Sequence, residues 1–171
     1  MPKVSPRTDR LSWPDYHMLL ALVAAQRSPD PNTQVGAVVV DNKNRILGLG
    51  YNGFPRGICV KSLSWSREDP DPLQTKYPYV VHAEKNAIYN SSQPVTNAIL
   101  YVSLFPCAEC AKDIIQAGIK QVIYLDNPYK NDWSVKAADK MFQLKDIFVK
   151  QHSWNLKEIK PCLQKLATLI T

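Results

Sequence analysis

Four side chains that can bind a metal ion or transfer protons lie in two short segments of this sequence. His82 and Glu84 are separated by one residue, and Cys107 and Cys110, directly after Pro106, are separated by two. Two thiolates and one imidazole supply three protein ligands for a tetrahedral Zn²⁺ ion, and the fourth position stays open for water, as in catalytic zinc sites. Glu84 is not needed as a ligand, so we expect it to transfer protons between water and a substrate.

The combined spacing of the two segments is typical of one class of reaction. The pattern H-x-E followed by P-C-x-x-C is the signature of zinc-dependent nucleobase deaminases. A C-x-x-C pair alone would be weak evidence, because redox-active cysteine pairs and zinc knuckles share it. The pattern predicts that water attacks C4 of a cytosine ring while Glu84 carries a proton to N3 and then to the departing amine.

Length and composition indicate one globular domain with a hydrophobic core. The chain has 171 residues, of which 45% are apolar. Its first residues lack the apolar segment of a signal peptide, and its longest apolar run, residues 18–25, is too short to span a membrane. We therefore expect a cytoplasmic protein in which Cys59 and Cys162, the cysteines outside the zinc pattern, stay reduced.

The net charge of +6 favours anionic partners, either nucleotides or nucleic acid. The lysines are scattered, and no dense arginine–aromatic cluster is present that would follow a nucleic-acid backbone. The charge itself does not separate these partners, and scattered lysines also fit an ordinary solvated surface. The missing cluster speaks against nucleic acid, so a small nucleotide is the expected partner.

Helices and strands are expected to alternate along most of the chain. Ser12 is a suitable N-cap for a first helix that has Pro14 in its first turn and ends near residue 26. Further helices are expected at residues 82–90, 107–117 and 134–144, and strands at 35–40, 45–51, 99–102, 122–125 and 147–149. Residues 52–79 read as a long functional loop, and residues 161–169 as a short amphipathic helix with Pro161 in its first turn.

This order of elements predicts an α/β fold. Strands alternating with helices in the second half indicate parallel pairing and helices on both faces of the sheet. Residues 1–10 are expected to be flexible and residues 11–171 to form a single zinc-dependent deaminase domain. His17 is expected to pack among apolar residues, and His152 to be exposed.

Longer segments outside the zinc pattern carry a more specific similarity. They read LSWPDY at 11–16, AQRS at 25–28, DPNTQVGA at 30–37, GLGYNGFP at 48–55, TKYPYV at 75–80, LFPC at 104–107 and IIQAGIK at 114–120. On these segments, over about residues 11–150, the chain resembles the deoxycytidylate (dCMP) deaminase family of eukaryotes and some phages.

The resemblance implies a cytidine-deaminase-like α/β/α sandwich of three layers with a five-stranded mixed sheet. It implies conversion of dCMP to dUMP and ammonia, which supplies dUMP for thymidylate synthesis, with one catalytic Zn²⁺ per subunit. It also implies a homohexamer that dCTP activates and dTTP inhibits. Whether Mg²⁺ accompanies an effector triphosphate stays open.

The resemblance also implies roles for residues outside the zinc pattern. Substrate-binding roles fall on Asn52 for the deoxyribose, on Arg27, Ser28 and Tyr129 for the 5′-phosphate, and on Ala83. Effector-binding roles fall on Gly50, Tyr51, Gly53, Arg56 and Lys61. Arginine suits phosphate because its N–H donors are paired. Without the resemblance, Arg27 reads equally well as a charge at a helix C-terminus, and Tyr129 as a half-buried tyrosine.

One segment departs from the family pattern. Relatives often continue after the YNG loop with an acidic G-C-S-D-D-like stretch, whereas residues 57–62 read GICVKS here. Our hypothesis is that Arg56 and Lys61 favour a more highly phosphorylated nucleotide or alter the effector response. The alternatives are a dCTP deaminase of the same fold, a nucleic-acid deaminase of the tRNA adenosine type, and a zinc-containing nucleotide-binding module without catalysis. Glu84 speaks against the last, because no structural zinc site requires it.

Overall fold

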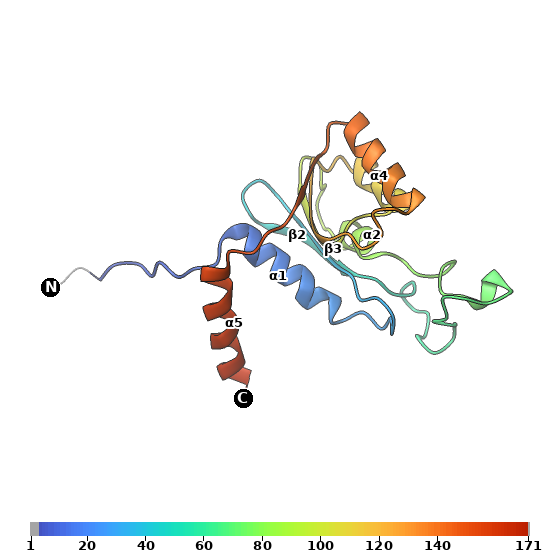
Figure 1. Cartoon of the computed structure of the whole chain (residues 1–171), viewed down its shortest axis with the longest axis horizontal. Coiled ribbons are helices and arrows are strands. Elements are labelled where there is room, and N and C mark those ends of the chain that lie inside the picture. Colours follow the sequence, from blue (N-terminus) through green and yellow to red (C-terminus); the bar gives the residue numbers. More distant parts are fainter. Residues whose placement is uncertain (1–3, 171) are drawn as a thin grey trace.

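The computed structural model describes residues 4–170, and a five-stranded mixed sheet lies at its centre (Figure 1). The strand order is β2-β1-β3-β4-β5. Strand β1 pairs antiparallel with β2 and β3, whereas β3, β4 and β5 are parallel. The strands are β1 (Gly36–Val40), β2 (Ile46–Tyr51), β3 (Ile99–Leu104), β4 (Gln121–Asp126) and β5 (Phe148–Gln151). The expected five-stranded mixed sheet is confirmed.

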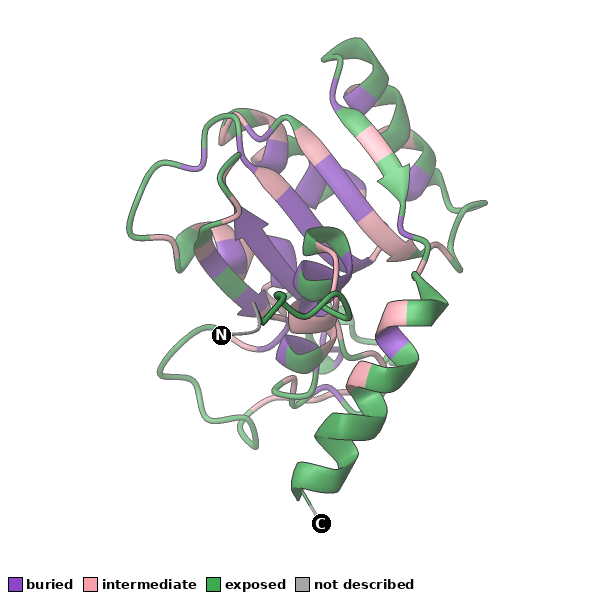
Figure 2. Cartoon of the chain, turned by 90° about the vertical axis from the view of Figure 1, so that its left-hand side faces the viewer, coloured by how far each residue is buried: buried purple, intermediate pink, exposed green. Residues whose placement is uncertain are grey.

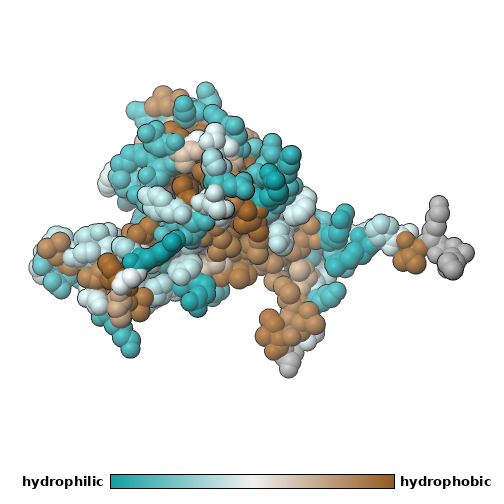
Figure 3. Space-filling model, turned by 180° about the vertical axis from the view of Figure 1, so that it is seen from behind, coloured by the Kyte–Doolittle hydropathy of each residue, from teal (hydrophilic) through white to brown (hydrophobic). Residues whose placement is uncertain are grey.

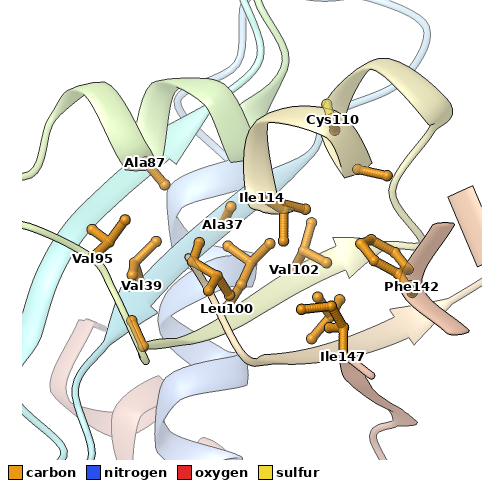
Figure 4. Packing of buried hydrophobic residues seen from close by; sticks show 14 of the residues in the cluster. Ala37, Val39, Ala87, Val95, Leu100, Val102, Cys110, Ile114, Phe142 and Ile147 are labelled. Carbon is orange, nitrogen blue, oxygen red and sulfur yellow. The ribbon is translucent and has the colours of Figure 1, made fainter. Parts of the chain in front are cut away.

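Helices cover both faces of this sheet. Helix α1 (Trp13–Ala25) packs on one face, where Met18 and Ala21 meet Val38 and Val40 of β1. On the other face lie α2 (Ala83–Tyr89), α3 (Ala108–Gln116) and α4 (Trp133–Leu144), whose apolar side chains form one buried cluster with Val39 of β1 and the neighbouring strands (Figure 4). Successive β1 side chains enter opposite cores, which explains why that strand is a continuous apolar run.

Polar side chains fix the ends of the helices near the expected positions. Ser12 Oγ accepts a hydrogen bond from Asp15 N at 3.3 Å, and Pro14 occupies the first turn of α1. Asp132 caps α4 by accepting from Ser134 N at 2.7 Å. Gly118 ends α3 with a φ of +78°, a backbone conformation that glycine adopts readily.

The start of the last helix, α5 (Leu156–Ile170), was predicted wrongly. It begins five residues before Pro161, the first residue of the expected helix 161–169, so this proline lies inside the helix. The start signal is Asn155, whose Oδ1 accepts from Lys157 N at 3.2 Å, with Glu158 three residues later. Glu158 Oε2 in turn accepts from Ser12 N at 2.9 Å, which connects α5 to the start of α1.

Helix α5 projects away from the sheet and is mostly exposed (Figures 1 and 2). Ile159 near its start is buried, and apolar side chains gather towards its far end (Figure 3). At the other end of the chain, residues 4–10 are exposed and form no helix or strand. The rest of the segment 1–10 lies outside the described residues, so its flexibility stays a prediction.

His152 is buried, which contradicts the expected exposure. Its Nε2 lies 3.0 Å from Asp15 Oδ1 on α1, and its backbone N donates to Tyr124 O at 2.7 Å. Burial lowers the pKa of His152. Asp15 Oδ2 also accepts from Asn155 N at 3.3 Å. The buried carboxylate of Asp15 therefore contacts both His152 and Asn155 and attaches this segment to α1. His17 is buried beside aromatic rings, as expected.

Helix α2 lies unusually close to strand β2 because two positions of β2 carry no side chain. A Cβ atom on Gly50 would stand 2.3 Å from Ala87 N and 2.4 Å from Ala83 O. A Cβ atom on Gly48 would stand 2.1 Å from Ala87 O. The backbones therefore meet directly, and the first turn of α2 is held at a fixed depth over the sheet.

We expect Gly50→Ala to lower the free energy of unfolding by at least the ~1–3 kcal/mol of ordinary overpacking, because backbone atoms must move. Urea unfolding measures this change. Gly53→Ala is the matched control, since a Cβ there meets Pro29 at an ordinary 3.5 Å. Equal stability of Gly50→Ala and the unsubstituted protein would show that the backbones of β2 and α2 leave room for a side chain at position 50.

Among residues 4–170, no helix combines the length and the apolar character needed to cross a membrane.

Candidate metal centre and active-site cavity

The three expected zinc ligands meet in space. His82 Nδ1 lies 3.2 Å from Cys110 Sγ and 3.4 Å from Cys107 Sγ, and the three ligand atoms all lie within 4.8 Å of one another. Tetrahedral zinc, with Zn–N of about 2.1 Å and Zn–S of about 2.3 Å, separates nitrogen and sulfur by about 3.6 Å. The side chains present therefore fit a zinc ion bound through Nδ1 of the histidine.

The backbone at the start of two helices brings these ligands together. His82 is the N-cap residue of α2 and Cys107 that of α3, and both have extended backbone angles. Neither side chain hydrogen-bonds to its own helix end, so each is available to the shared centre. Lys85 Nζ lies 3.0 Å from Asp113 Oδ2, an ion pair that joins the two helices beside the centre.

The pKa values of the three ligand side chains shift in different directions. Hydrogen bonds from the Cys110 thiol and from His82 lower the pKa of Cys107 to about 3. The same hydrogen bond to Cys107, together with burial, raises the pKa of Cys110, and the bond to Cys107 raises the pKa of His82. Metal must displace the remaining protons, so acid weakens metal binding.

Glu84 lies in the first turn of α2 beside the three ligands and is buried, with 4% of its surface exposed. Burial raises the pKa of its carboxyl group, because the charged form loses its hydration. A carboxyl that holds a proton more readily than usual suits general acid–base chemistry near neutral pH.

A cavity of about 340 Å³ opens above this centre, within the usual range for small-ligand sites. The buried residues Ala83 and Glu84 form its floor, and the exposed residues Arg67, Tyr77 and Tyr129 form its rim. The remaining wall consists of Asp30, Thr33, Val35, Asn52, Lys76, Val80, His82, Leu104, Phe105, Cys107, Asp132, Ser134 and Val135.

Asn52 is fixed in the cavity wall by its neighbours. Its Oδ1 accepts from Val35 N at 2.8 Å, and its Nδ2 donates to Thr33 O at 2.9 Å and to Asp30 Oδ2 at 3.3 Å. Asp30 also accepts from Lys76 Nζ at 2.5 Å in a buried ion pair. Burial opposes ionisation of Asp30, but hydrogen bonds from Lys76 and two backbone amides lower its pKa.

Comparison with known proteins places this geometry in a family. Residues 11–126 match the family model described as the cytidine and deoxycytidylate deaminase zinc-binding region. Human deoxycytidylate deaminase is 51% identical over 139 residues, which cover 81% of this chain and 78% of the human protein. The chain belongs to the cytidine and deoxycytidylate deaminase family.

Other members of the deaminase family agree. The probable deoxycytidylate deaminase of Drosophila melanogaster is 45% identical over 157 residues, 88% of this chain and 77% of the fly protein. Among solved structures, dCMP deaminase from the cyanophage S-TIM5 in complex with dCMP and dUMP is similar with a TM-score of 0.64 and 29% identity. That similarity covers 80% of this chain and 94% of the phage chain.

Several residues expected from the resemblance lie in the deaminase cavity, and others do not. Ala83, Asn52 and Tyr129 line it together with His82 and Cys107. Arg27 is exposed just beyond α1 and is not among the lining residues, and the Ser28 hydroxyl donates to Asn52 O at 2.9 Å. The phosphate-binding roles of Arg27 and Ser28 stay predictions.

The expected effector residues lie on β2 and the loop that follows it, outside the cavity lining. Gly50 is buried against α2, Tyr51 is half-buried, and Gly53 forms an isolated bridge with Val81. Arg56 and Lys61 are exposed, and Arg56 donates to Asn90 Oδ1. Their effector roles stay predictions.

Sequence reasoning missed Arg67 on the cavity rim. It lies in the long loop 52–79, where the structure has only the short 3₁₀ helix η1 (Pro72–Gln74). No periodicity marks Arg67, and its neighbour Glu68 makes it read as an ordinary surface charge. Only the course of the loop over the cavity brings it to the site.

Lys76→Met should lower the free energy of unfolding by about 3–5 kcal/mol at pH 7, because Asp30 is left buried and charged without its partner. Urea unfolding measures this loss. The double variant Asp30→Asn/Lys76→Met, which removes both charges, should recover part of it. A single variant as stable as the unsubstituted protein would contradict the assigned ion pair.

The pH dependence of this stabilisation follows from the lowered pKa of Asp30 in the folded protein. The contribution of the Asp30–Lys76 pair to stability is fully present above pH 4, which is about the pKa of Asp30 in the unfolded chain. It is lost as the pH falls through the lower pKa of Asp30 in the folded protein. In Lys76→Met the folded pKa rises, so the loss should begin at higher pH.

Proposed function

We propose that this protein catalyses the hydrolytic deamination of dCMP to dUMP and ammonia. The reaction class is supported by one observation: the buried Glu84 lies at the floor of a cavity beside His82 and Cys107, which cluster with Cys110 as metal ligands. The choice of dCMP is supported by the human relative, which is named deoxycytidylate deaminase.

Glu84 carries the protons of the proposed reaction. A Zn²⁺ ion held by His82, Cys107 and Cys110 would supply a water molecule that ionises near neutral pH. Glu84 accepts a proton from this water and delivers it to N3 of the cytosine ring, as oxygen bonds to C4. Glu84 then takes the second water proton, from the new hydroxyl group on C4, and passes it to the amino group. The C4–N bond breaks as the C4=O bond forms, and ammonia leaves. Because burial raises the pKa of Glu84, its carboxyl can hold the proton between transfers.

The walls of the cavity hold the rest of the nucleotide in this proposal. Asn52, fixed by its hydrogen bonds to Val35 and Thr33, faces the deoxyribose, and Ala83 borders the base. Both N–H groups of the Asn52 amide are engaged by Thr33 and Asp30, so its Oδ1, which keeps a second lone pair, would accept from a sugar hydroxyl. Tyr129 on the rim remains a candidate for phosphate contact.

Regulation and assembly belong to the same proposal and rest on the resemblance alone. We expect a cytoplasmic homohexamer that dCTP activates and dTTP inhibits, with Mg²⁺ as a candidate companion of the effector triphosphate. Effector binding is expected at Gly50, Tyr51, Gly53, Arg56 and Lys61. Because residues 57–62 read GICVKS, the effector response is where we expect this chain to differ most from its relatives.

Glu84→Gln should retain zinc but lower kcat by about 10²–10⁴-fold, the usual contribution of one general acid–base group. Zinc content by metal analysis and ammonia release at saturating dCMP are the measurements. Glu109→Gln is the matched control, because Glu109 is an exposed carboxylate in the first turn of α3. Unchanged kcat in Glu84→Gln would remove the role assigned to this residue.

A substrate panel decides between the proposed activity and its alternatives. Ammonia release is compared for cytidine, deoxycytidine, dCMP, dCDP, dCTP and an adenosine-containing RNA. We expect the highest kcat/KM with dCMP. A preference for dCTP or for RNA would reject the proposal, and zinc without any turnover would favour a binding module.

A further inference from the structure

Three side chains on the rim of the cavity, those of Arg67, Tyr77 and Tyr129, form a hydrogen-bonded cluster. Arg67 Nη2 lies 3.4 Å from Tyr129 Oη, and Arg67 also hydrogen-bonds to Tyr77. These two phenolic oxygens further raise the pKa of Arg67, so its guanidinium group stays charged. All three side chains are exposed and line the same cavity as Glu84.

The charge of Arg67 is not neutralised by a neighbouring carboxylate. Lys76, also in the cavity wall, is paired with Asp30 at 2.5 Å, and His82 belongs to the metal centre. Asp132, the other carboxylate of the wall, accepts from Ser134 N at 2.7 Å as the cap of α4. Within residues 4–170, no ion pair includes Arg67.

The buried floor and the exposed rim fix the direction in which a nucleotide can enter. The base must reach Glu84 at the floor, since that carboxyl moves the protons. With the sugar at Asn52, as in the proposed function, the 5′ carbon would face the exposed rim. An anionic group on the 5′ carbon would thus reach Arg67, the cation of the described wall that lacks a carboxylate partner.

We propose that Arg67, supported by the hydroxyl groups of Tyr77 and Tyr129, binds the 5′-phosphate and selects nucleotides over nucleosides. This inference rests on the proposed function. A guanidinium group offers two parallel N–H donors to a phosphate. Tyr129 accepts a hydrogen bond from Arg67, so its own O–H is available to donate to a phosphate oxygen.

Arg27 is the rival for this role. It follows the C-terminal end of α1 and is absent from the cavity wall, and the hydroxyl of its neighbour Ser28 is bound to Asn52 O. Charge alone does not separate the two arginines, but the shared cavity favours Arg67. The two assignments predict opposite results in a pair of variants.

The test compares kcat/KM for dCMP with kcat/KM for deoxycytidine, measured by ammonia release with the zinc-loaded protein. Arg67→Gln should lower the ratio of dCMP to deoxycytidine by about 10- to 100-fold, the range of charge-assisted hydrogen bonds. Arg67→Lys, which keeps the charge and loses the paired donors, should lower it less. The control Arg10→Gln changes an exposed arginine of the N-terminal segment and should leave the ratio unchanged.

An unchanged ratio in Arg67→Gln would overturn the inference, as would a large fall in Arg27→Gln without one in Arg67→Gln. Zinc content and thermal unfolding of each variant show whether the fold is intact. Failure of the proposed function is a separate outcome, visible as absent dCMP turnover in the unsubstituted protein. In that case, calorimetric titration with dUMP still decides the role of Arg67. Arg67→Gln should weaken dUMP binding by a similar factor, and equal affinity would overturn the assignment.

Discussion

The direct contact between the backbones of β2 and α2 is the constraint on which the active-site geometry depends. Gly48 and Gly50 bring α2 so close to the sheet that a single methyl group would collide with main-chain atoms. The first turn of α2 carries Glu84, and its N-cap is His82. The depth of the cavity floor is therefore determined by the absence of side chains on a strand that itself contributes no ligand.

The second half of the site comes from the parallel part of the sheet. Strand β3 ends at Leu104, and three residues later Cys107 caps α3, so the thiolates stand at the carboxyl end of a parallel strand. This edge is where α/β sheets commonly bind ligands. The buried acidic groups of this region are either paired or reactive. Asp30 is paired with Lys76, and the buried Glu84 has a raised pKa suited to proton transfer.

The sequence predicted those features that depend on short-range signals. The spacing of His82, Cys107 and Cys110 was sufficient to predict the ligand cluster, and caps such as Ser12 gave helix boundaries within one or two residues. Features that depend on distant partners were missed. His152 is buried with its Nε2 3.0 Å from Asp15, which is far away in the chain, and no local pattern reports that contact.

The two remaining errors have different physical causes. Pro161 was read as a helix start, whereas the start signal was Asn155 with Glu158. The helix continues through Pro161 although proline lacks the N–H that this turn would use. Arg67 was overlooked because a loop without periodicity gives no indication of which surface it crosses. Arg67, to which we assign the phosphate, is thus the residue of the proposed site that required coordinates.

The hydrogen bond between Ser12 N and Glu158 Oε2 has a topological consequence. It places the first turn of α1 beside the first turn of α5, so the folded domain is almost a closed ring of chain. Neither residue lines the cavity. A short linker between these two positions would close the ring. New termini could then be opened in the exposed β1–β2 turn, between Asn42 and Lys43. The result would be a circularly permuted deaminase with the same strand order in its sheet.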